Sequence, residues 1–172
     1  MIVEKKPKIM SKVFMVYIDF DNTLYEHPYC WTAEEDFEYN LLFGFGKLKF
    51  EEKYLNQELL KKLEQLVTYN REHGIKTRVN LLTGCKTSVF YNAKLEFISD
   101  NIPFVFDNYF MVSSQEDKIS MIEANNNHIS SDGYNIINTL VVDDNWAVTG
   151  KCQHLGYDGI TPGYFEKHYD WR

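Results

Sequence analysis

The chain has 172 residues, of which 44 % are apolar and 25 % charged, and these values are ordinary for one soluble domain with a sizeable core. The formal net charge of −7 argues against a protein whose main task is to grip a nucleic-acid backbone, because that task needs clustered lysine and arginine. The three cysteines form no CxxC pair, which indicates free thiols in a reducing compartment rather than a disulfide framework or a zinc site.

Targeting signals are not evident in the sequence. The amino-terminal stretch lacks the long apolar region and the small-residue cleavage site of a signal peptide. No run approaches the roughly 18 apolar residues of a membrane-spanning helix. We therefore expect a cytoplasmic protein with no membrane partner.

The first predicted element is an apolar strand, VFMVYI, at residues 13–18. Its composition is typical of a strand that is buried on both faces. It nevertheless ends in the polar segment DFDNT, at residues 19–23, with carboxylates at Asp19 and Asp21. Two acids one residue apart at the end of a buried strand indicate a functional site.

The segment at residues 25–55 has no clear periodicity and is rich in aromatic residues. Within it, FGFGK at residues 43–47 predicts a turn between short strands. We expect a small flap or minimal cap, inserted into a single domain whose core comprises residues 12–24 and 56–172. The aromatic side chains expected on this flap are Trp31, Phe37, Tyr39, Phe43 and Phe45.

Strand-like and helix-like segments alternate through the rest of the chain. Further strands are predicted at residues 77–82, 109–112, 136–142 and 159–161, and helices at 56–74, 88–99 and 114–124. The helix caps are expected at Asn56 and Ser114, and the inward face of the second helix at Val89, Phe90, Ala93, Phe97 and Ile98. This alternation predicts an α/β fold of three layers, Rossmann-like, with a central parallel sheet and helices on both faces.

Polar residues follow the carboxyl ends of three predicted strands: Asp19 and Asp21, Thr83 and Gly84, and Asp143 and Asp144. In open parallel sheets, ligands bind beyond these ends, so the fold would bring all six residues to one edge. Crowded carboxylates repel one another unless a cation lies among them, and oxygen ligands suit Mg²⁺. A threonine hydroxyl and backbone amides at a helix start suit a phosphate oxygen. One carboxylate could attack phosphorus, and the other could serve as general acid and base.

With these residues in place, the sequence resembles the haloacid dehalogenase-like phosphatases in four motifs, which occur in the right order. DFDNT matches the first motif, DxDx[TV], and LLTG at residues 81–84 matches the second. Lys118 matches the lysine of the third motif, and VVDDN at residues 141–145 matches the acidic pair of the fourth. The resemblance covers residues 13 to about 150. It implies Mg²⁺-dependent hydrolysis of a phosphomonoester through an aspartyl phosphate.

The resemblance also implies a role for each matched residue. Asp19 would be the nucleophile and a metal ligand, and Asp21 would be the acid and base, with its backbone carbonyl on the metal. The remaining roles are metal binding by Asp143 and Asp144, and phosphoryl binding by Thr83, the Gly84 amide and Lys118. Lys86 and Lys151 are rivals of Lys118 for the third motif. The five histidines show no ligand spacing, so we expect surface or capping positions for them.

The identity of the substrate stays open. Cys85 stands where phosphatases of polynucleotide ends usually carry arginine, and the acidic charge also disfavours a polymer, so we expect a small phosphorylated metabolite. The aromatic residues of the flap are the sequence feature that suggests a nucleotide, although an open site with a minimal cap can also admit a large substrate. A polynucleotide end or a protein substrate is not excluded, and a second subunit could cover the site. Two other classes are a catalytically silent binding or regulatory protein on this fold and a phosphorelay receiver domain.

Overall fold

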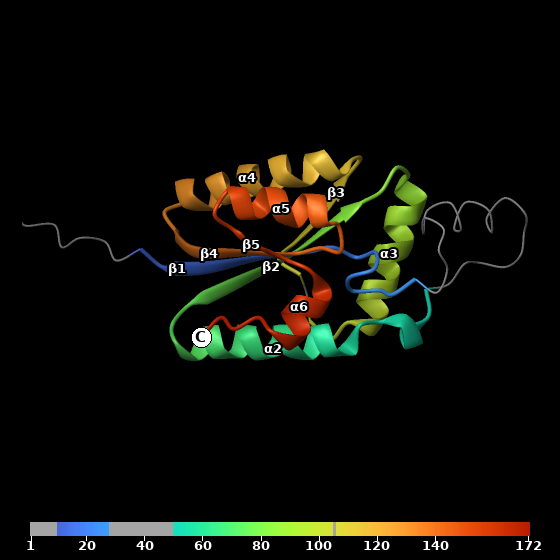
Figure 1. Ribbon diagram of the computed structural model, residues 1–172, viewed down its shortest axis with the longest axis horizontal. Coiled ribbons are helices and arrows are strands. Elements are labelled where there is room, and N and C mark those ends of the chain that lie inside the picture. Colours follow the sequence, from blue (N-terminus) through green and yellow to red (C-terminus); the bar gives the residue numbers. More distant parts are fainter. Residues whose placement is uncertain (1–9, 28–49, 105) are drawn as a thin grey trace, which may run out of the picture.

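The computed structural model describes residues 10–27, 50–104 and 106–172 (Figure 1). At its centre lies a five-stranded sheet with the strand order β3-β2-β1-β4-β5, and every neighbouring pair is parallel. The strands are β1 (Lys12–Ile18), β2 (Lys76–Gly84), β3 (Asn108–Val112), β4 (Asn135–Val142) and β5 (Asp158–Ile160). The prediction of an α/β fold built on a parallel sheet is confirmed.

Helices cover both faces of this sheet (Figure 1). One face carries α2 (Gln57–Glu72) and α6 (Pro162–Lys167), and the other carries α4 (Gln115–Ser131) and α5 (Trp146–His154). The helix α3 (Ser88–Asn101) lies beside the segment that follows β1, and a short 3₁₀ helix, η1 (Glu52–Tyr54), precedes α2. The architecture is therefore a three-layer Rossmann-like fold.

The central strand β1 is buried on both faces, as its sequence indicates. Side chains alternate along a strand, so its even-numbered residues from Phe14 to Ile18 pack with the leucines of α2 and with Phe165 of α6. Its odd-numbered residues from Val13 to Tyr17 pack into a second cluster with α4 and α5. This double burial holds the carboxyl end of β1 firmly in the middle of the sheet.

The cap of α2 connects this helix to the loop that follows β1. The Asn56 side-chain oxygen accepts a hydrogen bond from the Leu59 N–H at 3.1 Å, so the predicted cap is confirmed. The Asn56 amide group also donates to the Thr23 carbonyl at 3.2 Å. The helix start is thus tied to the segment that carries the first acidic pair.

The helix α4 is longer than predicted. Ser114 caps it, because its hydroxyl accepts from the Asp117 N–H at 3.2 Å, but the helix runs to Ser131 rather than to residue 124. The additional turns contain Asn125 and Asn126, both of which hydrogen-bond the Tyr17 hydroxyl at 2.8 Å. Such contacts with the sheet offset the weak helix propensity of asparagine, and a local pattern does not show them.

Other differences concern the carboxyl-terminal part of the chain and one face of α3. Helices α5 and α6 were not predicted, and Val89, expected to face inward from α3, is 51 % exposed. The predicted flap residues from Trp31 to Phe45, with the FGFGK turn, lie outside the described residues.

The two described cysteines, Cys85 and Cys152, are buried thiols. Burial raises the pKa of Cys152 to about 12, so this thiol is inert. Cys30 lies outside the described residues.

Among the described helices, none combines the length and the apolar character that a membrane crossing requires.

Candidate active site

The site begins at the two central strands, β1 and β4. Ile18 pairs with Val142, and the Asp19 N–H then donates to the Val142 carbonyl at 3.0 Å. Asp143 follows Val142, and its own N–H donates to the Ile160 carbonyl at 3.2 Å. The sheet order reverses between β1 and β4, which is where ligands bind in open α/β sheets. Asp19 and Asp143 therefore lie side by side at the topological switch point.

Three carboxylates converge at this point. Asp19, Asp143 and Asp144 each offer one oxygen, and these oxygens all lie within 4.8 Å of one another. Asp19 and Asp143 are buried, whereas Asp144 is exposed. The cluster is therefore closed on the protein side and open toward solvent through Asp144.

Lys118, in the first turn of α4, bridges the two buried carboxylates. Its Nζ lies 2.7 Å from Asp143 Oδ2 and 3.1 Å from Asp19 Oδ1, and its side chain is fully buried. Burial alone would lower the pKa of Lys118, but the two carboxylates outweigh burial and raise it above its ordinary value. Its rivals Lys86 and Lys151 are exposed, so Lys118 is the one of the three that reaches the acidic cluster.

The acidic cluster also changes the proton affinity of its members. Burial, and next the charge of Asp143, raise the pKa of Asp19 well above its usual range. The same two causes raise the pKa of Asp144. In the absence of a cation, the charged form of the cluster is therefore disfavoured.

The residues present fit a divalent cation. Asp19 Oδ1 is buried and has no hydrogen bond of good geometry from any described residue, although Lys118 lies near it. Among the described residues, the carboxylates of Asp19, Asp21, Asp143 and Asp144 face the ammonium groups of Lys94 and Lys118. The excess negative charge and the all-oxygen ligand set match Mg²⁺.

Asp21 belongs to a second cluster of polar groups. Its Oδ2 forms an ion pair with Lys94 of α3, and its Oδ1 lies 2.8 Å from His27 Nε2. Burial by itself would raise the pKa of Asp21, but the contacts with His27 and Lys94 lower it overall. The Asp21 carboxylate thus lies outside the three-carboxylate cluster, and the resemblance assigned only its backbone carbonyl to the metal.

The backbone turns sharply directly after the second acid, Asp21. Asn22 has φ +53°, in the left-handed region that asparagine tolerates better than most residues, and the Tyr25 N–H donates to the Phe20 carbonyl at 2.9 Å. An extended chain would aim Asp19 and Asp21 to the same side. In the structure the two carboxylates instead contact different lysines, Asp19 near Lys118 and Asp21 paired with Lys94.

Thr83 and Gly84 lie at the end of β2, next to β1. The Thr83 hydroxyl is fully buried and accepts a hydrogen bond from Lys94 Nζ at 2.8 Å, and the Gly84 carbonyl lies 3.3 Å from the same Nζ. The structure therefore brings the predicted phosphate-binding residues to the edge that carries Asp19 and Asp21, as the fold argument expected.

Sequence reasoning missed two residues of this site. Lys94 lies one turn from Phe90 and one turn from Phe97 on the buried face of α3, so the helical period could have marked it as a lysine placed inward. His27 was expected at the surface or at a cap, which is wrong, since its side chain is only 11 % exposed and contacts Asp21. Its six-residue separation from Asp21 across a turn follows no standard spacing.

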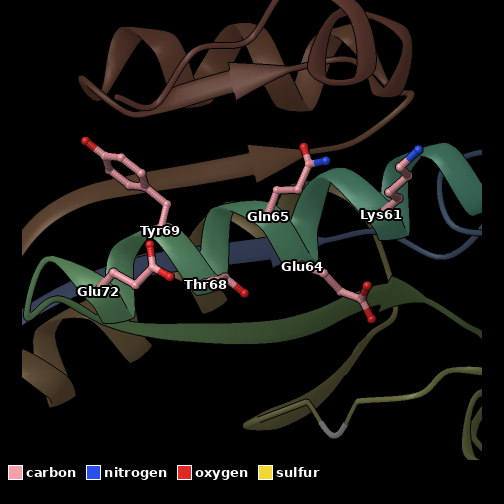
Figure 2. Close-up of a pocket in the computed structure, with 6 residues that line it drawn as sticks. All are labelled: Lys61, Glu64, Gln65, Thr68, Tyr69 and Glu72. Carbon is pink, nitrogen blue, oxygen red and sulfur yellow. The ribbon is translucent and has the colours of Figure 1, made fainter.

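Two surface hollows lie away from the acidic cluster. A hollow of about 400 Å³ runs along α2, and Figure 2 shows its six lining side chains, from Lys61 to Glu72, projecting from that helix. A neighbouring hollow of about 610 Å³ lies between α2 and the carboxyl-terminal segment. The acidic cluster and its two lysines line neither hollow, so chemistry rather than concavity identifies the site in the described part of the chain.

Comparisons with known proteins add little to this geometry. No protein-family model matches the sequence, and no curated protein matches it. A solved structure, the HAD domain of the effector protein Lem4 from Legionella pneumophila, is similar with a TM-score of 0.42 and 16 % sequence identity, over 88 % of this chain and 85 % of that chain. A similarity of this degree carries no argument about activity.

The raised pKa of Asp19 predicts a stabilising substitution. In the unfolded chain the pKa of an aspartate is about 3.9, and in the folded chain the pKa of Asp19 is higher, so ionising Asp19 costs folding free energy. This cost is absent below the unfolded pKa and grows as the pH rises through the window up to the folded pKa. We expect metal-free Asp19→Asn to melt above the wild type near neutral pH, with a difference that shrinks toward about pH 4.

Thermal melts in EDTA across this pH range measure the effect. The exposed Asp100 of α3 offers a matched control, since Asp100→Asn should show no such pH-dependent difference. A lower melting temperature for Asp19→Asn at neutral pH would contradict the repulsion argued here.

Proposed function

We propose that this protein is a phosphomonoester hydrolase that requires Mg²⁺ and works through a phosphoryl group carried on Asp19. One observation carries the proposal: the oxygens of Asp19, Asp143 and Asp144 converge within 4.8 Å, and Lys118 bridges two of them. These three carboxylates would hold the Mg²⁺. When bound, the cation would offset the charge of the phosphate and of the carboxylate that approaches it.

The chain supplies a nucleophile and a proton donor for the first step. An oxygen of Asp19 attacks phosphorus, and the bond from phosphorus to the leaving oxygen breaks. The protonated form of Asp21, a minor form because His27 and Lys94 lower the pKa of this carboxyl, gives its proton to that oxygen so that an alcohol departs. In the second step, water attacks the same phosphorus and gives a proton to Asp21. Inorganic phosphate leaves, and Asp19 is restored as a carboxylate.

The two remaining contacts serve positioning and charge. Lys118 offsets the negative charge of Asp19 and Asp143, so that a phosphate can approach the buried carboxylate. The Thr83 hydroxyl lies at the same edge and is a donor for a phosphoryl oxygen. Phosphoryl transfer depends mainly on such positioning and charge stabilisation.

For the substrate, we propose a small phosphorylated metabolite with an aromatic group, such as a nucleotide. The net charge of −7 disfavours a nucleic-acid polymer. Trp146 opens α5 two residues after Asp144 and is 81 % exposed, so its ring can stack on an aromatic group. The flap aromatics that first suggested a nucleotide lie outside the described residues.

The test is Mg²⁺-dependent release of phosphate. We expect release from p-nitrophenyl phosphate and from members of a nucleotide and sugar-phosphate panel, loss of release in EDTA, and recovery when Mg²⁺ is restored. A 3′-phosphorylated oligonucleotide and a phosphopeptide in the same panel separate the alternative substrates. Asp100→Asn serves as the matched control with unchanged rates.

Two outcomes would contradict the proposal. No release from any member of the panel would favour a silent binding protein on this fold. A long-lived phosphoryl group on the protein, without turnover, would favour a receiver domain.

A further inference from the structure

Lys94 is a fully buried ammonium group that none of the four sequence motifs includes. A lysine ammonium has three N–H donors, and here the acceptors around it are Asp21 Oδ2, Thr83 Oγ1 and the Gly84 carbonyl. Burying a charge is costly unless it is paired and hydrogen-bonded, and these acceptors satisfy that requirement. Lys94 thus connects the loop after β1 with the end of β2.

We propose that Lys94 is a positioning residue, which holds the Asp21 carboxylate and the Thr83 hydroxyl in the arrangement that phosphoryl transfer needs. This inference rests on the proposed function. It assigns the two lysines separate tasks. Lys118 contacts Asp19 and Asp143, whereas Lys94 contacts the acid and base residue and the phosphate-binding threonine.

Asp21 needs such an anchor because it lies on a turn rather than in a strand. Its side chain is 24 % exposed, and the next residue has a left-handed backbone conformation. Lys94 pairs with Oδ2, and His27 Nε2 lies 2.8 Å from Oδ1, so both oxygens of the carboxylate have a partner. Lys94 therefore fixes the position of the Asp21 carboxylate, which exchanges a proton with the leaving group in the proposed mechanism.

The same contact orients the Thr83 hydroxyl. A hydroxyl has one hydrogen to donate, and Thr83 Oγ1 accepts from Lys94 at 2.8 Å. The Thr83 hydrogen must then point away from Lys94, which leaves it for another acceptor such as a phosphoryl oxygen. One ammonium group thus prepares both a proton-transfer group and a phosphate donor.

Lys94 itself is held firmly. Its Nζ lies 4.4 Å from the centre of the Phe90 ring and 5.3 Å from that of Phe20, and both rings are buried. Ring faces attract a cation and also limit its movement. A methionine at this position would keep the packing against these rings and lose the three donors.

The test is a double-mutant cycle on the full chain, with kcat measured in Mg²⁺ for an alkyl phosphate and for p-nitrophenyl phosphate. With the alkyl phosphate, we expect Asp21→Asn to lower kcat by about 10²- to 10⁴-fold, the range for a general acid or base, and Lys94→Met by about 10²-fold. In the Asp21→Asn background, Lys94→Met should cost clearly less than in the wild type, because the part of its effect that passes through Asp21 is already lost and only the part that passes through Thr83 remains. The losses should be smaller with p-nitrophenyl phosphate, whose leaving group needs no proton.

Lys61→Met is the matched control, because Lys61 is exposed on α2, and it should keep wild-type rates. The positioning role would be overturned if the two losses multiply fully in the double variant, or if they are equal for both substrates. Either result would leave the proposed function intact. Should Lys94→Met fail to fold, Lys94→Arg is put through the same cycle, and its loss must also shrink in the Asp21→Asn background. An inactive wild type would overturn the proposed function and this inference together.

Discussion

Asp19→Asn will release no phosphate above background from any substrate that the wild type hydrolyses. An amide is a very poor nucleophile, so no phosphoryl group can pass to the protein. The side chain keeps its size, and the loss of one negative charge beside Asp143 relieves repulsion, so the variant should stay folded. Initial rates of phosphate release, together with acid-quenched detection of phosphorylated protein, measure the effect.

The thermal melts proposed for the same variant make its inactivity interpretable. A variant that is at least as stable as the wild type and still inactive has lost chemistry rather than structure. Asp100→Asn controls for the removal of a carboxylate elsewhere. Wild-type turnover in folded Asp19→Asn would remove Asp19 from the role of nucleophile.

Lys118→Met will lower the unfolding free energy of the metal-free protein by about 3 kcal/mol, the lower end of the range for breaking a buried ion pair. The substitution leaves Asp19 and Asp143 buried side by side without their shared cation. Mg²⁺ should return part of this stability, because it offsets the same charges. Urea unfolding in EDTA and in excess Mg²⁺ measures both effects.

Lys151→Met is the control for this experiment. Lys151 is an exposed lysine on α5, and its replacement should change the unfolding free energy by no more than about 0.5 kcal/mol. A loss in Lys118→Met as small as in this control would mean that the two buried carboxylates do not depend on Lys118.

The acidic and hydroxyl residues at the strand ends could be predicted from sequence for a clear reason. The apolar runs that lead to Asp19, Thr83 and Asp143 are strong local signals, and parallel strands place their carboxyl ends at one edge. The topology then brings residues more than 100 positions apart into contact without any further information. Local periodicity and this one topological rule were sufficient to predict the edge at which these residues gather.

Lys94 and His27 could not be placed in the same way. The tilt of α3 against the loop after β1 decides whether a lysine on its buried face meets a carboxylate or only the rings of Phe20 and Phe90. The contact of His27 depends on the turn at Asn22, which the strand pattern of residues 13–18 does not indicate. The length of α4 similarly depended on asparagines that hydrogen-bond Tyr17.

By itself, the sequence determined the α/β class, the parallel sheet and the edge at which acidic and hydroxyl groups gather. Those properties follow from short-range patterns, because the residue types in a segment indicate whether that segment forms a strand or a helix. Only the tertiary structure decided which lysine meets which aspartate, because a partner's identity depends on how helices pack across the sheet. Lys118 lies between Asp19 and Asp143, and Lys94 lies between Asp21 and Thr83, since α4 and α3 approach the same edge from different sides.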